Sequence, residues 1–288
     1  SSVPRQLLIE SDRRRVRDAF SRYISPNLVE HLLDNPEALR LGGERRDCSF
    51  ILTDLADFTK LVERDDPESV VSLLNDYLEG MIQIIFRHEG TLDRIVGDGL
   101  VVMFSAPVEQ KDHPARAVRC ALEMDRFSQS FVDEKIREGV DIGRTRIGVN
   151  TGTVIVGNVG GKSLFDYRAL GDAINTAARL ETVNKQLGTR ICIAGTTASR
   201  CPEFVGRPVG TLLLKGKTQP VEAFEPLANG AAGSSTAAYL EAYRLLEAGD
   251  SRAREAFATI AATDPLAAFH LRRLEAGDGG TRIVFSEK

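Results

Sequence analysis

The stretch Thr91-Leu-Asp-Arg-Ile-Val-Gly97-Asp98-Gly99-Leu-Val-Val-Met-Phe104 predicts two apolar strands joined at an acidic turn. Asp-Gly between apolar runs is a strong hairpin signal. An earlier stretch, Cys48-Ser-Phe-Ile-Leu-Thr-Asp54-Leu-Ala-Asp-Phe-Thr59, predicts a buried strand that ends at a carboxylate. One predicted helix separates the two stretches, so we expect neighbouring strands with both carboxylates facing one point. Such a pair predicts a hard-oxygen site for Mg²⁺ or Mn²⁺, the usual partner of a nucleoside triphosphate.

The residues after the first acid extend this prediction. The segment Leu55-Ala-Asp-Phe58-Thr59 is expected to enter a helix or turn, and its N–H groups would suit triphosphate oxygens. Each acid also has an ordinary interpretation, because Asp54 could cap a turn and Asp98 could simply occupy the hairpin. Their joint occurrence in these contexts favours metal binding.

Helices and strands alternate over residues 45–228. Helices are expected over 66–88, 114–135 and 172–187, from apolar residues at spacings of three and four. Strands are expected over 49–52, 144–150 paired with 153–157, 190–194, 209–214 and 221–226. The order β-α-β-β-α-β, with additions, predicts an α+β fold with a ferredoxin-like core.

Helical segments are expected on both sides of this core. Residues 1–44 predict a helical leader: a charged helix over 5–22, then a helix with Ser25 as N-cap and Pro26 at N1. Residues 229–288 predict a flexible linker and two Ala/Leu-rich helices over 236–275, which form a tetratricopeptide-like hairpin.

The composition is that of a soluble globular protein, with 42% hydrophobic and 27% charged residues among 288. The net charge of −4 argues against a nucleic-acid partner. No apolar run approaches the about 20 residues that span a bilayer, and no signal peptide is evident, so a cytoplasmic location is expected. Because the chain begins without Met, we interpret it as a piece of a longer protein, with a sensor or membrane domain upstream. The scattered cysteines are interpreted as reduced thiols, and zinc is not expected.

A polar pair lies on the helix predicted over residues 172–187. Asn175 and Arg179 are four residues apart and share one helix face, beside small residues that allow close packing. An amide and a guanidinium so placed suit a ribose and a developing phosphoryl charge. The alternative is a plain surface pair, which is common on helices.

Three ordered motifs resemble the catalytic domain of bacterial class III nucleotide cyclases. They are Phe50-Ile-Leu-Thr-Asp54-Leu-Ala-Asp-Phe58-Thr59, Gly97-Asp98-Gly99 and Leu170-Gly171-Asp172-Ala-Ile-Asn175-Thr-Ala-Ala-Arg179-Leu-Glu181. The resemblance covers about residues 45–227, and residues 20–33 resemble the helical element that precedes this domain in receptor-linked bacterial cyclases. It implies an adenylate cyclase of signal transduction that converts ATP to 3′,5′-cyclic AMP and pyrophosphate, acting as a homodimer with active sites at the interface.

The resemblance also implies a role for each motif residue. Asp54 and Asp98, with the backbone carbonyl of Leu55, would hold two Mg²⁺ or Mn²⁺ ions on the triphosphate. From the other subunit, Asn175 would position the ribose and Arg179 would stabilise the transition state. A terminal-phosphate ligand is implied at Lys215. The ribose 3′-hydroxyl would attack the α-phosphorus, so no side-chain nucleophile is required.

Two positions depart from the adenylate pattern of the family. The lysine four residues before the second metal aspartate is Arg94 here, and its partner in reading the base, usually Asp or Thr, is Arg168. Guanylate-type relatives usually carry Glu and Cys at these places. Two arginines could suit the O6 and N7 acceptors of guanine, or Arg168 could turn outward. ATP is favoured, because the other motifs follow adenylate relatives.

Three alternatives to an adenylate cyclase follow from these positions. One is a guanylate cyclase, and a second is a catalytically silent pseudo-cyclase that binds nucleotide and serves as a regulatory dimerisation module. A polymerase-like or cyclic-dinucleotide synthase palm would also carry two strand-borne acids, but it leaves Asn175 and Arg179 unexplained.

Overall fold

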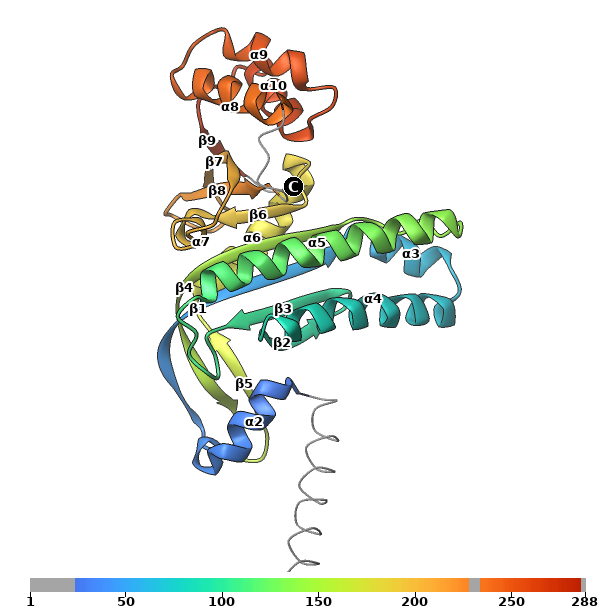
Figure 1. Cartoon of the computed structure of the whole chain (residues 1–288), viewed down its shortest axis with the longest axis vertical. Coiled ribbons are helices and arrows are strands. Elements are labelled where there is room, and N and C mark those ends of the chain that lie inside the picture. The colour runs from blue at the N-terminus through green and yellow to red at the C-terminus, as the bar shows by residue number, and fades with distance from the viewer. Residues whose placement is uncertain (1–23, 228–233, 286–288) are drawn as a thin grey trace, which may run out of the picture.

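A computed structural model of the chain describes residues 24–227 and 234–285. The predicted helix over 5–22 and most of the predicted linker lie outside the described residues. Over the rest, helices pack on a mixed sheet, with one group of helices at each end of the molecule (Figure 1). The α+β class expected from the sequence is confirmed.

The sheet runs in the order β2-β3-β1-β4-β6-β8-β7-β9, and β5 pairs with β4 beside this path. Its strands are β1 (Gly42–Leu55), β2 (Thr91–Val96), β3 (Gly99–Phe104), β4 (Thr145–Gly160), β5 (Phe165–Leu170), β6 (Ile191–Ala194), β7 (Gly206–Leu213), β8 (Val221–Pro226) and β9 (Arg282–Val284). The pairings are antiparallel except β4 with β6 and β7 with β9, which are parallel.

The helices cover both faces of the sheet. They are α2 (Pro26–Asp34), the 3₁₀ helix η1 (Pro36–Ala38), α3 (Phe58–Arg64), α4 (Pro67–Arg87), α5 (His113–Arg137), α6 (Asp172–Leu187), α7 (Gly195–Ala198), α8 (Ser234–Glu247), α9 (Ala253–Ile260) and α10 (Pro265–Glu275). Alternate residues of β1 and β3 enter different cores, because successive side chains of a strand point to opposite faces. Ile51 and Val102 pack with α4 and α5, whereas Phe50 and Val101 pack with α6.

The strand pair predicted over residues 144–157 is wrong in one respect. Those residues form one continuous strand, β4, which pairs with β1 through Ser49↔Thr151 and Cys48↔Gly152. The chain reverses only after Gly160, where the N–H of Gly161 donates to Leu164 O at 2.8 Å, and β5 is the returning strand. Gly152 therefore continues the ladder instead of turning the chain.

The C-terminal residues also differ from the prediction. Three helices replace the two expected, because the Asp264 side chain accepts hydrogen bonds from Leu266 N and Ala267 N and Pro265 occupies N1, which starts a new helix. A strand, β9, then joins β7. We call α8–α10 with β9 the C-terminal cap. It shares one hydrophobic core with α6, β6 and β7.

The helix predicted after Ser25 is confirmed as α2, but its cap residue has another task. The Ser25 hydroxyl makes no cap hydrogen bond; it contacts the N–H and the carbonyl of Leu92, at 2.7 and 3.1 Å. Asn27 Nδ2 donates to Thr91 Oγ1 at 2.6 Å. The start of α2 is thus hydrogen-bonded to the free edge of β2.

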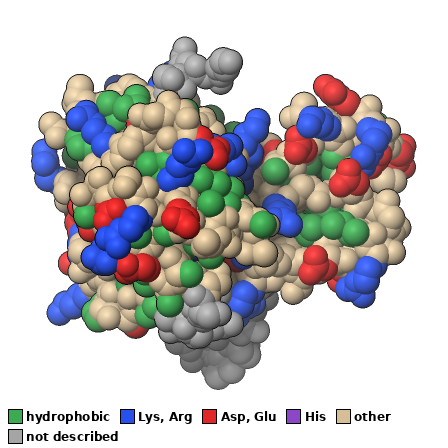
Figure 2. Space-filling model, turned by 90° about the horizontal axis from the view of Figure 1, so that it is seen from above, with side chains coloured by type: hydrophobic (Ala, Val, Ile, Leu, Met, Phe, Trp, Pro, Cys, Tyr) green, Lys and Arg blue, Asp and Glu red, His purple; other side chains and the backbone are tan. Residues whose placement is uncertain are grey.

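The surface carries both signs of charge. Figure 2 shows one face on which lysine and arginine side chains are interspersed with aspartate and glutamate. Over the ranges 24–227 and 234–285, no helix is both long and apolar enough to cross a membrane.

Candidate active site

Asp54 and Asp98 are brought together by the pairing of β1 with β3. The chain reverses between β2 and β3 at Gly97-Asp98, as predicted from the sequence. A Cβ on Gly99 would lie 2.4 Å from Thr53 O, so only glycine allows the turn to sit this close to β1. The backbone N–H of Leu55 donates to Asp98 Oδ2 at 2.7 Å. All three predicted metal-site residues therefore lie at one point.

Charges are concentrated at this point. Burial raises the pKa of Asp98 above its ordinary value, and the charge of Asp54 adds to the shift although the Leu55 N–H opposes it. Arg146, which lies directly opposite Asp54 in the β1–β4 ladder, forms an ion pair with it. The same guanidinium reaches Glu181 Oε1 from its Nε at 3.1 Å. Burial, and next the charge of Asp54, raise the pKa of Glu181 to about 7.

The donor set fits a hard divalent cation. Two carboxylates at a strand end, one of them 38% exposed, supply the oxygen ligands that Mg²⁺ and Mn²⁺ prefer. In the part of the chain that the structure describes, no group of three or more His, Cys, Asp or Glu side chains is placed to hold a metal. A site built at Asp54 and Asp98 would thus need ligands from backbone, water or substrate, which is how Mg²⁺ commonly binds with phosphates.

Phe58 and Thr59 begin α3, directly after this site. The helix starts behind Asp57, which has a left-handed φ of 59°. Phe58 is half-buried and packs against the core formed with α4 and α5, whereas Thr59 is exposed. The ring of Phe58 therefore has a structural contact, and the predicted use of this segment's N–H groups stays a prediction.

Arg94 and Arg168 both lie near a carboxylate that the sequence analysis did not single out. A β-bulge at Asp93 separates Leu92 from Arg94 in the pairing with β3. The bulge allows Arg94 Nη1 to contact Asp93 Oδ2 at 2.7 Å, and the Asp93 side chain is only 2% exposed. Burial raises the pKa of Asp93, whereas Arg94 and then Arg168 act to lower it. Arg168 itself pairs with Asp166 at 2.9 Å.

Asn175 and Arg179 do not face the acids of their own chain. Helix α6 lies close on β4, because a Cβ on Gly148 would come within 2.1 Å of Ala177 O. Its Glu181 points toward Arg146 and thus toward Asp54. Arg179, two residues earlier, is rotated by about 200° around the helix. One chain therefore holds both halves of the predicted site but keeps them apart.

Lys215 lies near Arg179, in the turn that follows β7. The N–H of Lys217 donates to Leu214 O at 2.9 Å, which closes a four-residue turn over 214–217. Gly216 in this turn has a φ of +67°, and a Cβ on it would lie 3.3 Å from Arg179 Nη2. The structure thus brings two of the predicted phosphate-binding cations to one stretch of α6.

Sequence reasoning missed four charged residues of this region. Asp93 was adjacent to a predicted residue, and the bulge that gives it its role has no sequence signal. The other three make contacts that join strands and helices far apart in the chain: Arg146, Glu181 and Lys217. A pattern read along one segment cannot show such contacts.

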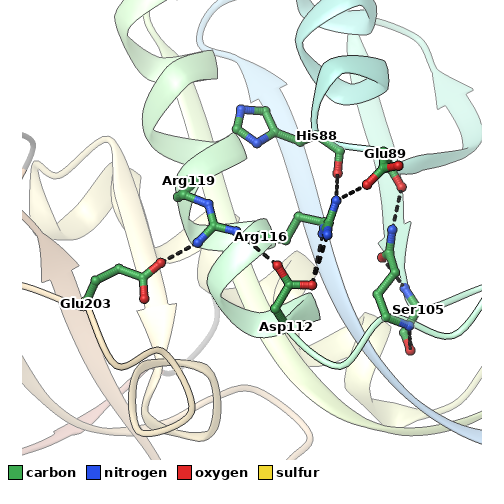
Figure 3. A network of polar contacts seen from close by, with 8 residues as sticks. His88, Glu89, Ser105, Asp112, Arg116, Arg119 and Glu203 are labelled. Carbon is green, nitrogen blue, oxygen red and sulfur yellow. Dashed lines mark hydrogen bonds and ion pairs between the residues drawn. The ribbon is translucent and has the colours of Figure 1, made fainter.

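A second polar network lies at the other end of β3 and is not part of this site. Arg116 contacts Glu89 and Asp112, and Arg119 contacts Asp112 and Glu203 (Figure 3). Ser105 belongs to this network through Gln110. Seven residues along an extended strand separate it from Asp98, which is about 20 Å. The network ties α4, α5 and the segment before β7 together.

Comparison with known proteins agrees with this geometry. Residues 43–225 match the family described as adenylate and guanylate cyclase catalytic domain. Adenylate cyclase 1 of Rhizobium meliloti is 34% identical over 215 residues, which are 73% of this chain and 32% of that protein. An uncharacterized protein of Mycobacterium tuberculosis is 30% identical over 218 residues, 75% of this chain and 39% of that one. The chain thus spans about a third of the length of these curated relatives.

Solved structures show the same likeness. The crystal structure of the adenylyl cyclase CyaB from P. aeruginosa matches with a TM-score of 0.60 and 29% identity, over 65% of this chain and 96% of that one. The crystal structure of the guanylyl cyclase Cya2 matches with a TM-score of 0.58 and 34% identity, over 65% of this chain and 94% of that one. The similar structures therefore include cyclases of both base preferences.

Proposed function

This chain belongs to the family of adenylate and guanylate cyclase catalytic domains, and we propose that it converts ATP to 3′,5′-cyclic AMP and pyrophosphate at a site shared by two copies. The observation that carries the proposal is the convergence of Asp54, Leu55 and Asp98 at the end of β1. It is supported by the second cluster, Arg179 with the turn that holds Lys215, on the far side of α6.

The residues present fit a divalent cation held by Asp54 and Asp98. Mg²⁺ or Mn²⁺ bound there would supply Lewis-acid chemistry, lowering the pKa of the ribose 3′-hydroxyl and neutralising charge on the departing pyrophosphate. Arg146 now neutralises Asp54. Any cation on that carboxylate competes with Arg146, which retains Glu181 as a partner. Its guanidinium then stays at the site and is available to triphosphate oxygens.

A second copy completes this site in the proposal. Because Arg179 and Asn175 face away from the acids of their own chain, the partner's α6 must supply them. Exposed apolar side chains support this assembly: they lie on β2, β4, β5 and the β4–β5 connection, namely Ile95, Val96, Ile155, Val159, Leu164 and Leu170. A homodimer would cover these side chains.

Arg94, Arg168 and Asp93 are proposed to face the purine base. Two cations around a buried carboxylate offer both donors and acceptors to the edge of a base. We propose ATP because the curated adenylate cyclase relative shares 34% identity. GTP is the second candidate, because the guanylyl cyclase structure is equally similar in sequence and guanidinium groups suit O6 and N7 of guanine.

The test is a cyclase assay on protein shown to be dimeric. ATP and GTP are each supplied with Mg²⁺ or Mn²⁺, and cyclic nucleotide and pyrophosphate are measured. We expect cyclic AMP from ATP at a higher kcat/KM than cyclic GMP from GTP, and loss of both in Asp98→Asn. A higher kcat/KM with GTP than with ATP would mean that GTP is the substrate and the protein is a guanylate cyclase. Nucleotide binding without product from either, in a verified dimer, would leave the pseudo-cyclase as the correct description.

A further inference from the structure

Lys217 links the turn after β7 to the first turns of α6. Its Nζ donates to Asp172 Oδ2 and to Thr176 Oγ1, the latter at 2.6 Å. The Lys217 side chain is only 12% exposed although it lies in a surface turn, whereas its partner Asp172 is 70% exposed. An ammonium group with two fixed acceptors and little exposure is already committed within the chain, so it is poorly placed to bind a substrate directly.

The turn that carries Lys217 is held by a buried anchor and a backbone hydrogen bond. Leu214, its first residue, is 1% exposed and anchors the turn in the core shared with the C-terminal cap. The N–H of Lys217, its fourth residue, donates to the carbonyl of Leu214. Gly216, the third residue, has the positive φ that a type II turn requires at that position. Lys215 is therefore held between a buried anchor and the clamp made by Lys217.

The clamp and Arg179 occupy one stripe of α6. Asp172, Thr176 and Arg179 are spaced by four and three residues, which places them on one side of a helix. Lys217 contacts the first two. The next residue back in the turn, Gly216, lies against the third, since a Cβ there would be 3.3 Å from Arg179 Nη2 and 3.9 Å from its Cζ. The turn thus lies along the helix and ends at the guanidinium.

We propose that Lys217 is a positioning residue for the cyclase reaction: it clamps the 214–217 turn to α6 and so sets Lys215 and Arg179 relative to each other. The inference rests on the proposed function, in which both cations act on the triphosphate. Without the clamp, Lys215 and Arg179 are both still present, but the distance between them is no longer fixed. A misplacement of this kind costs catalysis more than binding, because transition-state contacts depend most strongly on geometry.

Kinetics of three single variants and one double variant test the proposal. Lys217→Met is expected to lower kcat by about 10- to 100-fold with a smaller change in KM. Asp172→Asn should lower kcat by a smaller factor, because Thr176 still accepts from Lys217, and the double variant should lose no more than Lys217→Met alone. Lys217→Arg should retain most of kcat, since a guanidinium still pairs with Asp172. Lys111→Met, at an exposed lysine two residues before α5, is the matched control and should equal wild type.

Two kinetic outcomes would overturn the proposal. A raised KM with unchanged kcat in Lys217→Met would make Lys217 a substrate-binding residue. Full activity in Lys217→Met would show that the contact with α6 does not matter.

Hydrogen exchange separates this proposal from the cyclase assignment itself. In the nucleotide-free protein, Lys217→Met and Asp172→Asn should each speed exchange of the Lys217 amide by about 10-fold or more, because the turn opens when the clamp is gone. Lys111→Met should leave that rate unchanged. Unchanged exchange in both clamp variants would refute the clamp whatever the activity. Faster exchange in the two clamp variants, when the wild-type protein makes no cyclic nucleotide, would uphold the clamp and refute only the proposed reaction.

Discussion

The candidate active site and the junction of the C-terminal cap with strands β7 and β8 each contain an arginine between two acids, and the two groups differ in burial. At the site, Arg146 bridges Asp54 and Glu181, and Asp54 is 38% exposed. At the junction, Arg207 of β7 bridges Glu225 of β8 and Asp264 of the cap, and Asp264 is 4% exposed. Arg207 also lies over the ring of Tyr239, 4.3 Å from its centroid. Similar charges therefore serve two purposes.

The group at the junction is a fixed joint. Asp264 is also the N-cap of α10, and the hydroxyl of Tyr239 donates to Pro208 O at 2.7 Å, so two partners of Arg207 are themselves held by further contacts. At the site, by contrast, Asp54 ends a strand and keeps an exposed side. A buried pair is costly to break, whereas a half-exposed pair can exchange partners at little cost. The Arg207 group and the Arg146 group therefore differ in exposure to solvent more than in charge.

The largest expected effect comes from breaking the site group. Asp54→Asn removes a proposed metal ligand and should lower kcat/KM by about 10³-fold or more, because several kcal/mol of charge stabilisation are lost. Its free energy of unfolding should stay within about 1 kcal/mol of wild type, as for other half-exposed pairs. Steady-state kinetics and urea denaturation check both values, with Asp76→Asn on the exposed face of α4 as the control. A large loss of stability would mean that Asp54 belongs to a fixed joint as well.

The second expected effect is a loss of stability without a loss of activity, at Asp264 of the cap. Asp264→Asn keeps the N-cap of α10, since Asn caps as well as Asp, but it leaves the buried Arg207 with one acid fewer. We expect the free energy of unfolding to fall by about 3 kcal/mol. Activity per folded molecule should remain, because no proposed catalytic group is touched. The control is Glu241→Gln, which breaks an exposed pair with Arg244 and should cost less than about 1 kcal/mol.

The free energy of unfolding should also fall at acidic pH because of a buried histidine in the cap, a feature that the site does not share. Burial, and next the charge of Arg273, lower the pKa of His270 to about 3. The unfolded chain then binds more protons than the fold below pH 6.5, so the stability from neutral His270 is complete above about pH 6.5 and is lost as the pH falls toward 3. At pH 5 the loss is about 2 kcal/mol. Thermal denaturation of wild type and His270→Phe at several pH values measures this loss of stability. If stability fell with pH in parallel for the two proteins, the prediction for His270 would be contradicted.

The residues that were predictable are those whose signal is local. Helix α6 has the predicted bounds, Asp172–Leu187, because Gly188 with φ +75° ends it and its apolar spacing is regular. Asp98 was predictable because Asp-Gly between apolar runs specifies a turn. Both signals lie within a few residues of the feature they specify.

The residues that were missed depend on pairing between distant segments. Arg146 meets Asp54 only because β1 and β4 pair in a register that places them opposite each other, 92 residues apart. A shift of one residue would turn the guanidinium to the other face of the sheet. The parallel pairing of β9 with β7 likewise depends on how the cap docks, which periodicity along the chain does not encode.

The smallest expected effect concerns the choice between ATP and GTP. At this part of the site a buried carboxylate holds an arginine, as Asp264 holds Arg207. Asp93 is 2% exposed and holds Arg94 at 2.7 Å, so this part of the site resembles the fixed joint. Arg94→Lys replaces a fork of donors by one point charge. We expect the ratio of kcat/KM for ATP to that for GTP to rise by about 10-fold, because a fork suits guanine O6 and N7 better than a single ammonium does.

The comparison of the two regions decides how this result is interpreted. Competition between ATP and GTP in one reaction gives the ratio directly, and Arg45→Lys, an exposed arginine near the start of β1, is the matched control. A ratio unchanged by Arg94→Lys, but changed in Asp93→Asn, would mean that Asp93 holds Arg94 away from the base. Arg94 would then be part of a fixed joint like Arg207, and base choice would rest on Arg168, whose pair with Asp166 is exposed and free to exchange partners.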